Sequence, residues 1–249
     1  MEINGTSVAV TKHANSAVPD EAVLSCVESK LLKEWAASVD PELIIDKVYL
    51  KDCDFFGKRI GFLKIEAVAT FHGVRVPGIC FLRGGAVSIL VILRCEEDGK
   101  DYVILTRQPR VPVGSAGLLE LPAGMIDDAQ EFAGVAAKEL REETGLILNK
   151  ENLVDLTALV NGVSGVRPVK GMLPSAGGCD EFLRLFLHMR TVTRAELDAM
   201  RGKATGLLEE GEVIVLDIVE YKDAWKVCSD SKLHSSMFLY ERLSAARII

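Results

Sequence analysis

Three glutamates on one predicted helix constrain this chain most strongly. Residues 133–144 are typical of a helix, and Gly145 directly after them is typical of a left-handed helix end. Within that helix Glu139, Glu142 and Glu143 stand at positions i, i+3 and i+4, which places their carboxylates on one face. Like charges so close together destabilise an isolated helix, so the folded chain must offset their repulsion.

Two interpretations of this acidic face follow from the charges alone. A hard divalent cation, which prefers oxygen ligands, would neutralise the carboxylates. Alternatively the face is solvated, and Lys138 and Arg141 on the same helix balance its charge. The residues around the helix have to separate these two interpretations.

The spacing of the preceding residues favours the cation. Gly124 follows an apolar run and Pro122; five residues separate Gly124 from Gln130, and seven residues separate Gln130 from Lys138. The segment from Lys138 to Leu146 reads Lys-Glu-Leu-Arg-Glu-Glu-Thr-Gly-Leu. This pattern resembles the Nudix box, in which Gly, Glu and the run Arg-Glu-aliphatic-any-Glu-Glu-any-Gly-aliphatic follow one another at the same spacing.

The chain departs from that box at two positions. Gln130 stands where the family has Glu, and Lys138 stands where it has Arg. The resemblance implies that these two positions form a structural ion pair, and a Gln–Lys pair can still hydrogen-bond without full charge pairing. The departures therefore concern the rigidity of the loop before the helix more than the chemistry of the site.

Composition bounds the remaining possibilities. The 249 residues suffice for one large domain or two small ones, and the net charge of −7 disfavours general binding to nucleic acid or to anionic membranes. Six cysteines without a C-x-x-C pair favour reduced thiols in a reducing compartment. No apolar run is long enough to span a membrane, and the first residues do not resemble a targeting peptide. We therefore expect a cytoplasmic protein.

The pattern along the chain predicts a tail and two domains. A helix is expected to follow Pro19, and residues 46–76 are predicted to form a small antiparallel β unit. Such a unit cannot bury its own faces, so it should pack on the next domain or on another subunit. The predicted divisions are a mobile tail over 1–18, a helix with the small β domain over 19–77, and a larger domain over 78–249.

Periodicity also predicts the elements of the larger domain. Besides the acidic helix, Thr193 and Glu196 form a predicted capping box at the start of a short helix. A long loop is expected over 161–181, and long loops in compact domains are often functional. The predicted strands are 85–93, 102–106, 153–160, 182–188 and 213–218, and a final helix is predicted over 230–246.

Beyond the box, residues 77–246 resemble the ADP-sugar diphosphatase branch of the Nudix hydrolases, which includes ADP-ribose and ADP-glucose enzymes. The segments that carry this resemblance are 84–87, Gln108 with Arg110, 119–124, 174–181 and 209–212. The resemblance implies an α/β fold, an α/β/α sandwich with a mixed sheet, together with a small N-terminal antiparallel β domain. It also implies a homodimer in which the N-terminal domains are exchanged.

The resemblance further implies a site with two or three Mg²⁺ ions, with Mn²⁺ as a substitute. The implied metal ligands are Glu139, Glu142, Glu143 and the backbone carbonyl of Ala123, and Glu142 and Glu143 also count among the catalytic residues. Glu181 matches the acid of the family's loop, as a general base or water-positioning residue. Asp180 is the alternative to it.

A local cationic cluster, Arg107-Gln108-Pro109-Arg110, stands out in an acidic chain. Arginine binds phosphate in a planar, bidentate manner, so Arg107 and Arg110 are candidate substrate ligands. Arg83 and Gly124 complete the candidate substrate-binding set. The alternative is a salt-bridged strand end.

These implications lead to a hypothesis about function. We expect hydrolysis of the pyrophosphate bond of an ADP-sugar, giving AMP and a sugar phosphate. The alternatives are a UDP-sugar diphosphatase and a catalytically inactive nucleotide-binding regulator, which the departures at Gln130 and Lys138 favour.

Overall fold

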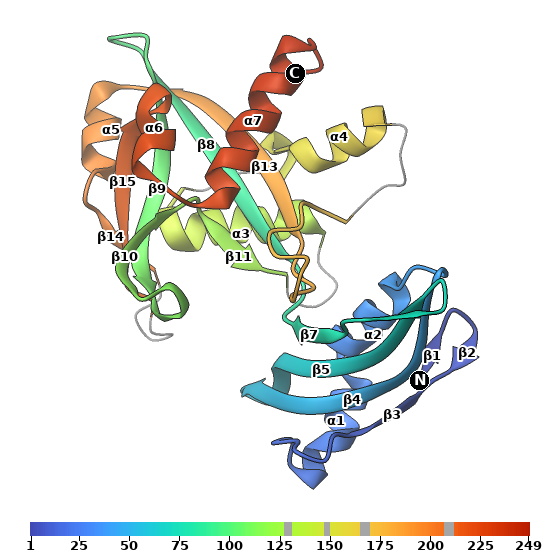
Figure 1. The fold of residues 1–249 in the computed structure, drawn as a ribbon. Coiled ribbons are helices and arrows are strands. Elements are labelled where there is room, and N and C mark those ends of the chain that lie inside the picture. Colours follow the sequence, from blue (N-terminus) through green and yellow to red (C-terminus); the bar gives the residue numbers. More distant parts are fainter. Residues whose placement is uncertain (127–130, 147–149, 165–169, 207–211) are drawn as a thin grey trace. The chain divides into compact units, whose positions relative to one another are not determined.

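The computed structural model describes residues 1–249 except 127–130, 147–149, 165–169 and 207–211. The chain forms two compact units (Figure 1). The first unit combines Met1–Gly85 with Leu173–Glu181, and the second combines Ala86–Met172 with Phe182–Ile249. Each unit has its own apolar core.

A twisted sheet with two helices on one face makes up most of the first unit. Its long hairpin, β4 (Leu43–Phe56) and β5 (Arg59–Phe71), buries alternate residues such as Leu63 and Ile65 beneath the helices, as strand periodicity requires. The other elements are β1 (Glu2–Ile3), β2 (Thr6–Ser7), β3 (Ala9–Lys12), η1 (Asp20–Ala22), α1 (Val23–Glu28), α2 (Lys30–Ser38), β6 (Val74–Val76) and β7 (Ile79–Leu82).

Three expectations for this unit differ from the structure. Residues 1–18 were predicted to be a mobile tail, but β3 pairs in parallel with β4 and the apolar side chain of Val8 is buried. The predicted single helix is interrupted at Ser29, whose extended backbone and side-chain bond to the Leu32 N–H begin a second helix. The unit extends past residue 77, because β7 pairs with β5.

The second unit is built on a mixed sheet. Its order is β12-β13-β8-β9-β15-β14, with β10 beside β9 and β11 beside β8. β13 runs parallel to β8, and the other pairs are antiparallel. The bounds are β8 (Ala86–Cys95), β9 (Asp101–Arg110), β10 (Ser115–Glu120), β11 (Ala123–Met125), β12 (Val154–Asp155), β13 (Leu183–Val192), β14 (Ala204–Thr205) and β15 (Ile214–Glu220).

Helices cover both faces of this sheet (Figure 1). Alternate residues of β8 point to opposite faces: Ile89 and Val91 meet α3 and α5, and Leu90 and Ile92 meet α4, α6 and α7. The predicted α/β/α sandwich with a mixed sheet is therefore confirmed. The helices are α3 (Phe132–Thr144), α4 (Leu156–Ser164), α5 (Arg194–Met200), α6 (Tyr221–Val227) and α7 (Ser231–Ala245), with 3₁₀ turns η2 (Val111–Val113) and η3 (Lys150–Asn152).

One predicted strand of this unit is wrong. Residues 153–160 form two strand residues followed by α4, because the carboxylate of Asp155 accepts the N–H of Ala158 and caps a helix there. The capping box of α5 and the final helix are confirmed.

Candidate active site

The acidic helix forms as its pattern predicts. α3 ends where Gly145 adopts a left-handed conformation, with φ of 76°. The side chains of Val135, Ala136 and Leu140 are buried against the sheet. This packing fixes the helix and leaves its acidic face beside β11.

The backbone of β11 lies against two of the predicted glutamates. A Cβ atom added to Gly124 would lie 1.8 Å from the carboxyl carbon of Glu139, so only glycine allows this close approach. The adjacent N–H of Ala123 donates to the Glu143 carboxylate at 3.0 Å. The structure therefore brings Ala123, Gly124, Glu139 and Glu143 together.

The raised pKa of Glu143 indicates that too little positive charge surrounds its carboxylate. Burial raises the pKa of Glu143 to about 8, and the carboxylates of Glu139 and Glu212 act in the same direction. The Ala123 N–H and the cation of Arg110 act in the opposite direction and are outweighed. A cation at this place would stabilise the charged carboxylates.

The donor atoms fit a hard divalent cation. Carboxylate oxygens of Glu139 and Glu143 lie beside a backbone strand whose carbonyl groups are further oxygen donors. Glu142 is engaged elsewhere, with Lys138 at 3.7 Å and Arg141 at 3.9 Å. Within the described ranges, three or more acidic, histidine or cysteine side chains do not converge in a metal-holding group.

The two arginines of the cationic cluster have separate ion-pair partners. Arg107 makes two hydrogen bonds to Asp217 on β15, at 2.9 and 2.6 Å, as the salt-bridge alternative predicts. The Nε of Arg110 donates to Glu120 at 2.5 Å. The positive charge of Arg110 also acts on Glu143, where it lowers the pKa of the carboxyl group. Arg110 is therefore the arginine of this cluster that is coupled to the carboxylates of α3.

The predicted loop acids, Asp180 and Glu181, belong to the first unit. One oxygen of Asp180 accepts the backbone N–H groups of Arg83 and Gly84, at 2.7 and 3.2 Å. Glu181 forms an ion pair with the guanidinium of Arg83 at 3.5 Å. Asp180 therefore has a structural role, because it holds two backbone N–H groups. Among the hydrogen bonds and ion pairs of the described residues, the Glu181 carboxylate contacts the Arg83 side chain and no backbone group.

Sequence reasoning missed part of the surroundings of this site. Glu212 belongs to a segment that carries the family resemblance but was given no role in the site, yet its charge acts on Glu143. Lys232 and Asp230 at the start of α7 bind Glu120 and Leu121, and only the helix-capping position of Asp230 carries a sequence signal. Gln130 and residues 209–211 lie outside the described residues.

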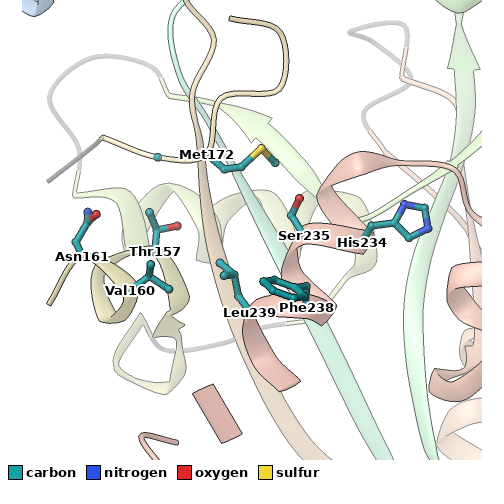
Figure 2. A pocket seen from close by; sticks show the side chains of 9 residues that line it. Thr157, Val160, Asn161, Met172, His234, Ser235, Phe238 and Leu239 are labelled. Carbon is teal, nitrogen blue, oxygen red and sulfur yellow. The ribbon is translucent and has the colours of Figure 1, made fainter. Parts of the chain in front are cut away.

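A separate cavity lies on the opposite face of the sheet. Its volume is about 450 Å³, and Figure 2 shows side chains of α4 and α7 around it, including Val160, Phe238 and Leu239. None of the predicted site residues lines it. The cavity is therefore separate from the carboxylates of α3.

Comparisons with known proteins find relatives of this chain. The NUDIX domain family matches residues 84–231. "Nudix hydrolase 14, chloroplastic" of Arabidopsis thaliana is 39% identical to the chain, over 92% of this chain and 75% of that protein. "ADP-ribose pyrophosphatase" of Bacillus subtilis (strain 168) is 27% identical, over 78% of this chain and 89% of that protein.

A solved structure supports the fold. "Crystal structure of ADP compounds hydrolase" matches with a TM-score of 0.53 at 18% identity, covering 84% of this chain and 98% of that chain. The described part of the chain contains no helix with the length and apolar character needed to cross a membrane. All six cysteines are free thiols.

Proposed function

This chain belongs to the Nudix family, and we propose that it hydrolyses the pyrophosphate bond of an ADP-sugar with divalent cations. Water attacks one phosphorus atom, one P–O bond of the bridge breaks, and the products are AMP and a sugar phosphate. For ADP-ribose the second product is ribose 5-phosphate. The observation that carries the proposal is the contact of Glu139 and Glu143 with the backbone of Gly124 and Ala123.

Four groups would hold the cations in this proposal. They are the carboxylates of Glu139, Glu142 and Glu143 and the carbonyl oxygen of Ala123. When bound, Mg²⁺ or Mn²⁺ would neutralise the pyrophosphate and lower the pKa of a coordinated water. For Glu142 to take part, its carboxylate has to leave the weak contacts with Lys138 and Arg141.

The remaining roles belong to side chains that bind substrate or move a proton. Arg110 would hold phosphoryl oxygens, whose negative charge grows in the transition state. Arg107 and Arg83 are further candidates, and each, like Arg110, already has a carboxylate partner. Glu181 would accept the proton of the attacking water or orient that water, and Arg83 would hold its carboxylate between turnovers.

The choice of an ADP-sugar rests on relatives rather than on a described base pocket. The Bacillus subtilis relative is named for ADP-ribose, and the solved structure of similar fold is named for ADP compounds. A UDP-sugar is the second candidate, because the residues of the proposed cation site recognise the pyrophosphate and not the base.

Product analysis tests the proposal directly. The purified chain is incubated with Mg²⁺ and ADP-ribose, ADP-glucose, UDP-glucose or GDP-mannose, and the products are separated by chromatography. We expect AMP and a sugar phosphate from an ADP-sugar, and no product when EDTA is present. A faster reaction with UDP-glucose would replace ADP by UDP in the proposal.

A catalytically inactive regulator is the alternative from another class. It rests on Gln130 and Lys138, and in the structure Lys138 contacts Glu142 at 3.7 Å. The variant Gln130→Glu/Lys138→Arg restores the usual family residues. Binding of ADP-ribose without hydrolysis by the natural chain, together with hydrolysis by this variant, would favour the regulator.

We also propose a homodimer formed through the first unit. The sheet face away from α1 and α2 presents an aromatic cluster, in which the centre of the Phe62 ring lies 4.9 Å from that of Phe56, edge-on, and 5.1 Å from that of Phe81, tilted. Light scattering at micromolar concentration tests this assembly, and a monomer with undiminished activity would contradict it.

A cytoplasmic location is the last part of the proposal. The six free thiols suit a reducing compartment. A fluorescent fusion expressed in the cells of origin locates the protein, and import into any organelle would contradict the proposal.

A further inference from the structure

Four charged side chains of the second unit form a continuous charged network from the start of α7 to β9. The Nζ of Lys232 lies 3.0 Å from Asp230 Oδ1 and donates to Glu120 Oε1 at 2.9 Å. The other oxygen of Glu120, Oε2, accepts from Arg110 Nε at 2.5 Å. The order of contacts is therefore Asp230, Lys232, Glu120, Arg110.

Three members of this charged network are largely buried. The exposed fraction of the side chain is 5% for Asp230, 8% for Glu120 and 13% for Lys232, against 41% for Arg110. A buried carboxylate is costly unless each oxygen has a partner, and each oxygen of Glu120 has one cation. The charged network therefore has a buried end at α7 and an accessible end at Arg110.

The balance of charge at Glu120 depends on both cations. Burial would raise the pKa of Glu120, but Lys232 and Arg110 outweigh burial and hold the pKa below its usual value. Burial likewise acts against the charge of Lys232, and Asp230 and Glu120 overcome it. Glu120 thus stays ionised and keeps a fixed orientation toward Arg110.

The buried end is also tied to the strand that carries the candidate site. The second oxygen of Asp230 accepts the backbone N–H of Leu121 at 3.0 Å. Leu121 stands two residues before Ala123, whose N–H binds Glu143. The first turn of α7 thereby holds both the backbone before Ala123 and the side chain that orients Arg110.

We propose that Lys232 is a positioning residue, which fixes Glu120 and through it the guanidinium of Arg110 in the orientation that binds the substrate's phosphoryl oxygens. This inference rests on the proposed function for the identity of the substrate. In this proposal Lys232 acts through Glu120 and Arg110 rather than through its own contact with the substrate. Without its ammonium group, Glu120 has one cation for two oxygens, so Glu120 turns or protonates and Arg110 loses its fixed acceptor.

Chemical modification of arginine tests the first step without any substrate. Phenylglyoxal reacts with guanidinium groups, and peptide mass spectrometry gives the rate at Arg110 and at Arg107 in the same sample. In Lys232→Met, Arg110 should react faster than in the natural chain, because it is no longer held by an oriented carboxylate. Arg107 is the internal control, because its partner Asp217 does not belong to the charged network.

Three further variants separate positioning from a general loss of structure. Lys232→Arg keeps the cation and should restore the slow reaction of Arg110. Lys226→Met removes an exposed lysine that contacts Asp223 on α6, and it should change neither rate. If Lys232→Met does not fold, Glu120→Gln/Lys232→Met removes both buried charges together, and Arg110 should again react faster.

A double-mutant cycle tests the consequence for activity. Lys232→Met should lower kcat/KM by about tenfold or more in the natural background, within the range that coupled residues show, but by less than about twofold when Arg110 is already alanine. Equal losses in both backgrounds, or an unchanged rate of Arg110 modification, would overturn the proposal. A natural chain that hydrolyses none of the tested nucleotide sugars would instead overturn the proposed function, and the modification rates would then decide the positioning of Arg110 alone.

Discussion

Ala123 donates its backbone N–H to the Glu143 carboxylate at 3.0 Å, so the strand before α3 and the last turn of α3 are joined at one acidic side chain. At the neighbouring residue Gly124, the Glu139 carboxyl group fills the space that a side chain would need. Two carboxylates are thus held against consecutive residues of one strand. The following predictions test what this arrangement does.

Loss of any one of the three carboxylates should impair catalysis much more than folding. Glu139→Gln, Glu142→Gln and Glu143→Gln keep the size of each side chain and remove a charged cation ligand, so kcat should fall by about 100-fold or more. Steady-state kinetics over a Mg²⁺ titration measures the change. Glu131→Gln is the control, because Glu131 is exposed and contacts Lys150; full activity of the three variants at limiting Mg²⁺ would refute the assignment.

Gly124 should not tolerate a methyl group. In Gly124→Ala the new Cβ would collide with the Glu139 carboxyl group, so the carboxylate or the strand must move and activity should fall by at least about tenfold. Gly134→Ala is the matched control. No atom lies within 4 Å of its added Cβ, and alanine in this first turn of α3 should leave activity unchanged and add at most about 1 kcal/mol to the free energy of unfolding.

Asp180 and Glu181 should separate into a structural and a catalytic residue. Asp180→Asn weakens the acceptor of two backbone N–H groups, so the free energy of unfolding should fall by about 1–3 kcal/mol. Glu181→Gln should lower kcat strongly with little change in KM or in stability. Urea denaturation and kinetics of both variants give the comparison, and the reverse result would exchange their roles.

A Mg²⁺ titration of Glu181→Gln separates the possible roles of this residue further. Rescue of the rate at high Mg²⁺ would identify Glu181 as a metal ligand. A low rate at every Mg²⁺ concentration would identify it as the base or water-positioning residue. An unchanged rate would leave the proton transfer to another group.

Protonation of His188 should destabilise the fold in mild acid. His188 is buried on β13, and burial lowers the pKa of its imidazole below 6.5. The unfolded chain therefore binds a proton below about pH 6.5 that the folded chain does not, and the free energy of unfolding should fall by up to about 1.4 kcal/mol per pH unit. This loss should continue until pH reaches the folded-state pKa.

Urea denaturation between pH 5 and pH 8 measures this dependence. His188→Gln lacks the titrating group, so its stability should vary less with pH over this range than that of the natural chain. His234→Gln removes an exposed histidine of α7 and should keep the natural pH dependence. Identical pH profiles for the natural chain and His188→Gln would contradict the prediction.

The sequence predicts those parts of the fold whose local signals agree with their packing. Residues 133–144 combine helical spacing with a glycine that ends the helix, and α3 has these bounds within one residue. The apolar run at 153–160 suits a strand or a buried helix equally well. Its capping contact from Asp155 to Ala158 decides for the helix, and this was the signal that the strand prediction overlooked.

The side-chain partners of the site were less accessible to sequence reasoning. Arg107 and Asp217 lie on neighbouring strands β9 and β15, and their pairing follows from strand register rather than from spacing along the chain. The same applies to Lys232, which reaches Glu120 only because α7 begins beside the end of β10. A motif can show which residues are available for chemistry, but tertiary contacts decide which of them are already engaged.

The first unit is assembled from two separate stretches of chain, and this has a consequence for synthesis on the ribosome. The N–H of Phe81 in β7 donates to Gly178, and its carbonyl oxygen accepts the N–H of Asp180, so part of the backbone hydrogen bonding of β7 depends on Leu173–Glu181. All of Ala86–Met172 is translated before that stretch emerges. During this interval β7 has an open edge, and a chain interrupted before Leu173 would keep that edge available for pairing with other nascent chains.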